Sequence, residues 1–211
     1  MKKNKKEKKE DVFETQCWAY EIIEDPYQVF AQCYDFAGID NYRKLIRNTL
    51  LSVYDNKVYK KLEPSSTLYE YSIILSVLNV AYYINRQNKK EAINFFFGDK
   101  LDSRYYCEGE KKEVDWECFP RFLSMKEYEN PYLVFKHIFQ YQDLGEWKKD
   151  LQEVIERTLS SYNEDMFLEI LPIYLHLSKL MEAAHLINVR EVTHIKGYFK
   201  GLRNNQKTES L

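Results

Sequence analysis

The segment EDPYQVFAQCYDF (residues 24–36) determines how the rest of the chain is interpreted, because a close version of it occurs twice. The second version, ENPYLVFKHIFQY, occupies residues 129–141, and five of the thirteen positions are identical. Both begin a helix well, since Asp and Asn favour the N-cap and proline favours the first helical position. The apolar residues that follow predict one wide apolar face in each version. We therefore expect an internal duplication.

The segments that follow these two helices support the same expectation. Residues 41–54 and 147–159 carry apolar residues three and four positions apart, which predicts a second helix in each copy. Asp143 and Glu146 have the spacing of a capping box at the start of the later one. A third, mostly apolar helix is predicted over 67–86, and its counterpart ends at Asn188 once the alignment offset changes from 105 to 103 residues.

The predicted fold class is therefore all-α, an internally duplicated three-helix unit that forms a pseudo-two-fold bundle of about six main helices. The expected organisation is a disordered Lys-rich tail (1–10), a first helical repeat (11–98), a connector (99–123), a second helical repeat (124–203) and a frayed tail (204–211), with both repeats packed as one domain. A further, leading helix is predicted over Val12–Ile23, ahead of the first copy.

The connector has no counterpart elsewhere in the chain. Arg104–Glu108 and Glu113–Phe119 alternate apolar and polar residues around Gly109–Lys112, which predicts a small β-hairpin between the copies. A segment that is not duplicated is free to diverge, so Tyr105 and Trp116 are candidate contacts for a partner. The simpler and favoured interpretation is a linker that covers the joint between the copies.

Composition favours a soluble, cytoplasmic, helical protein. Of the residues, 45% are hydrophobic and 30% charged, and the chain has only six glycines and five prolines. Its four cysteines form no CxxC pair, so free thiols in a reducing compartment are expected. No signal peptide and no membrane-spanning segment is recognisable, and no membrane partner is expected. The sequence does not indicate an oligomeric state.

Polar residues recur at matching places on the two long apolar helices, where Ser76 matches Lys179 and Asn79 matches Glu182. This polar strip either meets solvent, which is the favoured interpretation, or lines a crevice between the copies and binds a partner. Lys179 and Glu182 are therefore candidate partner-binding residues, together with Tyr105 and Trp116.

Catalytic and metal-binding patterns are weak. Glu182 and His185 have the Glu-x-x-His spacing of di-iron bundles, but the matching positions in the first copy are Asn79 and Tyr82, which cannot supply a second pair. An exposed strip is the favoured interpretation. No phosphate-binding loop, nucleophile elbow or zinc-protease motif occurs. We expect no cofactor, no metal and no catalytic residue.

The N-terminal segment carries a formal charge of +4, and the rest of the chain carries −6. Its lysines are Lys2, Lys3, Lys5, Lys6, Lys8 and Lys9. They are candidate contacts for nucleic acid, with Arg190, Lys196, Lys200 and Arg203 as a second basic cluster. A solubilising tail is the favoured interpretation, since the body behind it is acidic.

Three functions remain after these exclusions. The first is a non-catalytic protein-interaction or regulatory protein that works through a surface. The second is a nucleic-acid-associated protein that uses the basic N-terminal segment. The third is a small-ligand-binding protein or enzyme with a site in the crevice between the copies. The sequence favours the first.

Overall fold

The computed structural model describes residues 9–87, 102–108, 116–160 and 168–192, and the backbone of 194–195 and 198–199. These residues form an all-α protein, apart from a short antiparallel pairing of β1 (His194–Ile195) with β2 (Tyr198–Phe199). The helices are α1 (Pro26–Phe36), α2 (Ile39–Tyr54), α3 (Pro64–Arg86), α4 (Met125–Glu129), α5 (Tyr132–Tyr141), α6 (Leu144–Leu159) and α7 (Ile170–Glu191). The predicted fold class is confirmed at this level. We call residues 11–87 the first half and residues 102–192 the second half.

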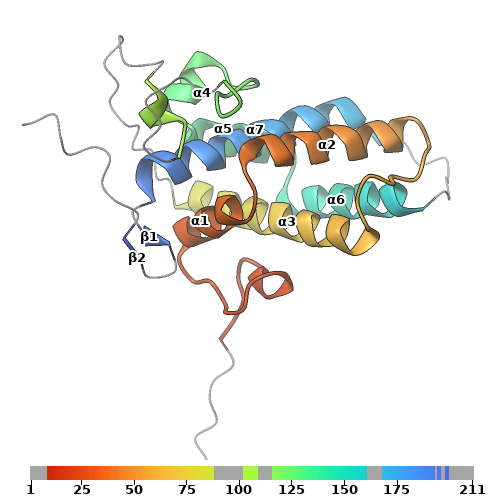
Figure 1. Cartoon of the computed structure of the whole chain (residues 1–211), viewed down its shortest axis with the longest axis horizontal. Helices are drawn as coiled ribbons and strands as arrows, with labels where there is room; N and C mark the ends of the chain where they lie inside the picture. Colours follow the sequence, from red (N-terminus) through yellow and green to blue (C-terminus); the bar gives the residue numbers. More distant parts are fainter. Residues whose placement is uncertain are drawn as a thin grey trace, which may run out of the picture.

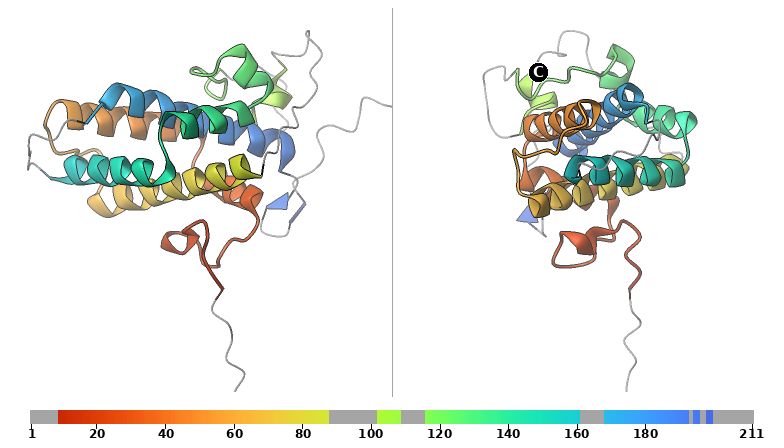
Figure 2. Two further views of the ribbon diagram at one scale, coloured as in Figure 1. Left: turned by 180° about the vertical axis from the view of Figure 1, so that it is seen from behind. Right: turned by 90° about the vertical axis from the view of Figure 1, so that its right-hand side faces the viewer.

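The long helices form two layers (Figures 1 and 2). α2 and α7 lie side by side in one layer, and α3 and α6 lie side by side in the other. Each layer therefore combines one helix from each half. The shorter helices α1 and α5 both pack against α3 and against α7, which joins the two layers at one end.

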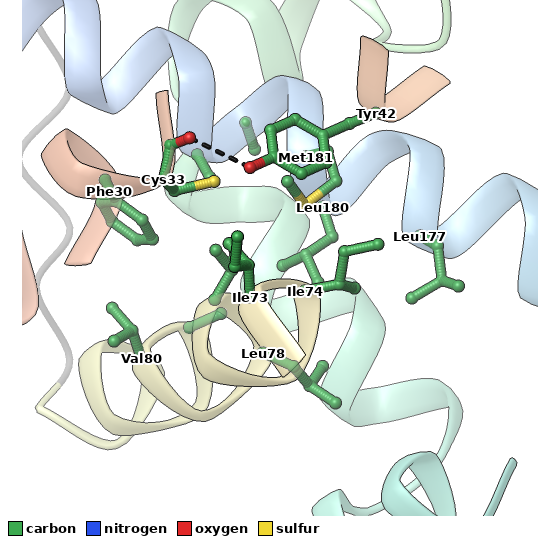
Figure 3. Packing of buried hydrophobic residues seen from close by; sticks show 14 of the residues in the cluster. Phe30, Cys33, Tyr42, Ile73, Ile74, Leu78, Val80, Leu177, Leu180 and Met181 are labelled. Carbon is green, nitrogen blue, oxygen red and sulfur yellow. Dashed lines mark hydrogen bonds between the residues drawn. The ribbon is translucent and has the colours of Figure 1, made fainter. Parts of the chain in front are cut away.

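The core contains the same hydrogen bond twice. The Tyr42 hydroxyl donates to the carbonyl of Cys33 across 3.0 Å, as Figure 3 shows, and the Trp147 indole N–H donates to the carbonyl of Ile138 across 3.2 Å. Both donors are completely buried, and each ties a long helix to the shorter helix before it. Each pair of matching residues is separated by 105 positions.

Matching residues also meet each other where α1 contacts α5. The hydroxyls of Tyr27 and Tyr132 are 3.1 Å apart, and the rings of Phe30 and Phe135 lie 6.2 Å apart between centroids. Both contacts join residues that are 105 positions apart in the sequence.

The predicted starts of α1 and α6 are confirmed, whereas α5 begins at Tyr132, one residue later than predicted, and α3 begins at Pro64, three residues earlier than predicted. The Asp25 carboxylate accepts from the amide of Tyr27 across 3.0 Å, and the Asn130 side chain accepts from the amide of Tyr132 across 3.2 Å. Asp143 and Glu146 form the expected capping box at the start of α6, with bonds of 2.8 and 2.9 Å. Such caps satisfy amides that lack a partner within the helix.

The predicted leading helix over Val12–Ile23 is wrong. Only a 3-10 helix, η1 (Thr15–Cys17), forms there, and Glu14 before it has a left-handed φ of 57°. The Asp11 carboxylate accepts from the amides of Thr15 and Gln16, and such local side-chain bonds compete with helical ones. Residues 11–24 instead form an irregular segment against α3, which we call the first leading segment (Figure 1).

The predicted hairpin is not confirmed. Residues 109–115 lie outside the described residues, and the described parts of this region contain a 3-10 helix, η3 (Ser103–Tyr105), and turns rather than strands. The carbonyls of Tyr105 and Tyr106 accept bonds from Arg190 and His185 of α7, so the backbone is held by a helix. We call the described residues 102–108 and 116–129, which include η3 and α4, the second leading segment; it lies on the other side of the molecule from the first (Figures 1 and 2).

Candidate binding groove

An open apolar groove lies between the C-terminal end of α2 and the N-terminal end of α7. It has a volume of about 710 Å³. Leu50, Leu51 and Tyr54 of α2 line one side, and Leu171 and Tyr174 of α7 line the other. The exposed fractions are 47% for Leu51, 73% for Tyr54 and 66% for Leu171. Large apolar side chains therefore gather in solvent at the junction of the two halves, which is a common property of interaction sites.

A second pocket, of about 580 Å³, adjoins the groove along α2. Arg47 and Tyr174 line both. The pocket is basic, because its lining contains Arg43, Lys44, Arg47, Lys61 and Arg121 but a single acid, Asp40.

The charges of this pocket are only partly neutralised. The Asp40 carboxylate forms ion pairs with both Lys44, at 2.5 Å, and Arg121, at 3.6 Å. Lys61 donates to the neutral amide oxygen of Asn48. Arg47 is exposed and makes no hydrogen bond or ion pair within the part of the chain that the structure describes. Positive charge therefore remains in the pocket.

A buried ion pair supports the floor of the basic pocket. The Arg43 guanidinium donates twice to one oxygen of the Glu182 carboxylate, at 2.6 and 2.9 Å, and both side chains are almost fully buried. The same carboxylate accepts from the backbone amides of Arg121 and Phe122, each at 2.9 Å. Glu182 thereby fixes the backbone that carries Arg121 and Phe122 into the pocket.

The polar strip is not in solvent, so the favoured interpretation of it was wrong. Ser76, Asn79 and Glu182 are each at most 5% exposed, because the two leading segments cover them. Lys179 is partly exposed and donates to both carboxylate oxygens of Glu127, at 3.0 and 2.9 Å. Among the predicted partner-binding residues, Glu182 and Lys179 therefore hold the second leading segment.

The other two predicted contacts belong to that segment itself. Trp116 is 62% exposed and packs edge to face on Phe119, and Tyr105 is half-buried, with its carbonyl bonded to Arg190. The structure places neither residue in the groove or the basic pocket.

The Glu127 carboxyl shows how strongly the second leading segment is fixed. Burial raises the pKa of Glu127, but bonds from Lys179, Ser124 and His137 outweigh this and hold the pKa at about 2. The carboxylate is therefore charged at any ordinary pH. It anchors the beginning of α4 to the side of α7.

Glu182 and His185, which have the Glu-x-x-His spacing, do not form a shared site. Glu182 and His185 bind different partners, Arg43 and the carbonyl of Tyr106. Within the described ranges, no three His, Cys, Asp or Glu side chains gather closely enough to hold a metal ion. Burial raises the pKa of the Cys33 thiol to about 12, so it packs as a small apolar side chain.

The basic N-terminal segment lies outside the described residues except for Lys9. That lysine forms an exposed ion pair with Glu24, at 2.6 Å. Arg190, from the suggested second basic cluster, is buried and packs over the ring of Tyr128. Lys196, Lys200 and Arg203 lie outside the residues whose side chains are described.

Sequence reasoning missed the groove and the basic pocket. One pattern pointed to them: Arg43, Arg47, Leu51 and Tyr54 repeat at three or four positions, so they share a face of α2. Ile46, Leu50 and Val53 form a different face, which is the predicted core face of the helix. Leu51 and Tyr54 therefore had no place in the predicted core.

Comparison of the chain with protein-family models, curated proteins and solved structures found no match in any of the three. Among the described helices, none combines the length and apolar character needed to cross a membrane.

Proposed function

We propose that this protein is a non-catalytic protein-interaction protein, and that the groove between α2 and α7 receives a helix of a partner protein. The observation that carries the proposal is the convergence of Leu51, Tyr54 and Leu171, all largely exposed, on one groove. A groove between two helices suits the apolar face of a third helix. Burying these side chains stabilises a complex by about 1.5–3 kcal/mol each when the burial is complete.

A small ligand is the second candidate. The groove volume of about 710 Å³ falls in the range of small-molecule sites, about 300–1,000 Å³. The groove also lies between the two halves, where a ligand site was expected. Its open side favours the partner helix, because small-molecule sites bury most of the ligand surface. The nucleic-acid alternative gains no support from the described residues, because Lys9 is the single N-terminal lysine among them and it pairs with Glu24.

We also propose that the halves are repeats of one three-helix unit. The paired bonds of Tyr42 and Trp147 support this, as do the contacts between Tyr27 and Tyr132 and between Phe30 and Phe135. The proposal matters for function because the repeats differ at the groove. The positions that match Arg47 and Leu51 are Gln152 and Glu156.

Two groove variants, Leu171→Asp and Leu51→Glu, test the proposed function. Leu51→Glu installs the residue found at the matching position of the second half. The control is Leu68→Asp, which changes the exposed leucine that matches Leu171 on α3. Proteins captured from the native cells by the unchanged chain are identified, and binding of each purified candidate is then measured.

We expect both groove variants to weaken binding by about tenfold or more, and the control to leave it unchanged. All three variants are expected to keep the helical circular dichroism spectrum, because the altered side chains are exposed. A partner that binds both groove variants as tightly as the unchanged chain would exclude the groove as its site.

A further inference from the structure

The exposed face of α2 changes character along its length. Its N-terminal part carries Lys44 and Arg47, and its C-terminal part carries Leu51 and Tyr54. Ten residues separate Lys44 from Tyr54, which corresponds to about 15 Å along the helix. The groove and the basic pocket are therefore two ends of one continuous surface of about three helical turns.

The basic end of this surface is built from separate parts of the chain. Lys61 comes from the α2–α3 connection and Arg121 from the second leading segment, and both meet Arg47 in one pocket. The Glu182 carboxylate fixes the backbone at Arg121 through its amide. Because this backbone is held in place before binding, positioning Arg121 costs less conformational entropy when the pocket takes up an anion.

The charge of this end stands out against the rest of the protein. The whole chain has a formal net charge of −2, yet four cations of this pocket are exposed: Lys44, Arg47, Lys61 and Arg121. Asp40 is the single acid in the lining. Complementary charges at an interface select the partner and set its orientation more than they raise affinity.

We infer that the partner segment is an amphipathic helix with acidic residues at one end. This inference rests on the proposed function. The apolar face of the segment packs on Leu51, Tyr54 and Leu171, and its acidic end lies over Arg47, Lys61 and Arg121. The segment follows α2 over about three turns, so it spans about eleven residues. The acidic end determines in which direction the helix lies in the groove.

The experiment is a selection from a phage-displayed library of 16-residue helical peptides with random surface positions. The selection is run on the unchanged chain and on the double variant Arg47→Glu/Lys61→Glu. The matched control is Lys136→Glu/Lys149→Glu, which makes the same charge change at exposed lysines of α5 and α6. Dissociation constants of the enriched peptides are measured at two salt concentrations.

We expect enriched peptides to carry an apolar stripe and acidic residues at one end. Their affinity should fall about tenfold for the Arg47→Glu/Lys61→Glu variant, and remain unchanged for the control. The affinity for the unchanged chain should fall as salt rises, since exposed charges are screened. Leu171→Asp should abolish binding of the same peptides.

Two results would overturn the inference, and they separate it from the proposed function. If the enriched peptides are apolar, show no preference for acidic residues and bind the charge variants equally well, the acidic end is excluded and the groove remains as the binding site. If Leu171→Asp does not weaken the enriched peptides, or if no helical peptide is enriched, the groove is excluded as well.

Discussion

The two leading segments cover matching strips of α3 and α7 by different chemistry. The first is held by neutral hydrogen bonds, from the Trp18 indole to Ser76 at 2.8 Å and from Asn79 to the carbonyl of Phe13 at 3.4 Å. The second is held by charges, because Glu182 and Lys179 stand where α3 has Asn79 and Ser76. At positions that match in the sequence, the attachment is therefore neutral on α3 and ionic on α7.

The middle helix of each half reaches the leading segment of the other half. Arg43 of α2 donates to the carbonyls of Glu117 and Phe119, and its counterpart Lys148 of α6 pairs with Glu14. The Lys148–Glu14 pair is partly exposed, so it contributes little to stability. The buried Arg43–Glu182 pair is different, since loss of one partner leaves a charge in the interior. The attachment of the second leading segment therefore depends on the charges of Arg43 and Glu182. The same segment also shapes the basic pocket.

The largest effect is expected for Glu182→Ala. This change leaves the buried Arg43 guanidinium without its carboxylate and the amides of Arg121 and Phe122 without an acceptor. We expect a loss of about 3–5 kcal/mol in the free energy of unfolding. Asn79→Ala, at the matching position, should cost about 1 kcal/mol. Urea denaturation of both variants measures the difference, and equal losses would show that the two attachments do not differ.

A smaller effect is expected from acid. Because the folded-state pKa of Glu127 is about 2 and its ordinary value is 4.5, the charged carboxylate stabilises the fold above about pH 4.5. This stabilisation, on the order of 2 kcal/mol, is lost as the pH falls from 4.5 towards 2. Glu127→Gln should already lack it at neutral pH and show a shallower pH dependence. Unfolding curves measured between pH 7 and pH 3 check this, and parallel curves for variant and unchanged chain would contradict it.

The smallest effect is expected for Trp18→Phe. The change removes the indole donor to Ser76 and keeps an aromatic ring against α3. Ser76 retains bonds to the carbonyls of Glu14 and Ser72, so we expect a loss of about 0.5–1.5 kcal/mol. Because the lost bond is neutral, the loss should be the same in low and high salt. If the loss in the free energy of unfolding changes with salt, charged groups contribute to the contact between Trp18 and α3 as well.

Much of the fold was predictable because it depends on local patterns. Asp25, Asn130 and the Asp143–Glu146 pair cap helices through contacts within a few residues, and such contacts are visible in the sequence. The apolar spacing of α2 and α6 likewise fixed their buried faces, with Tyr42 and Trp147 at the centre of each. For α2 and α6, the helix position and the buried face therefore followed from periodicity.

The polar strip was misjudged because its burial depends on distant residues. Glu182 is covered by residues about 60 positions earlier, in a segment without regular structure. Leu171 illustrates the opposite case, since it lies on a helix that was expected to be mostly apolar and central, and it is exposed. Neither outcome can be derived from one helix at a time, because both depend on which helices become neighbours.

The distribution of the two halves over the layers has a consequence for dividing the chain. α2 packs against α7 and α6, and α3 packs against α6, so both helices bury surface against the other half. A fragment that contains one half alone lacks the partner for its longest helices and exposes their apolar faces. Two such fragments made together would complement each other, so the region around residues 109–115 is a natural place to divide the molecule into a split reporter.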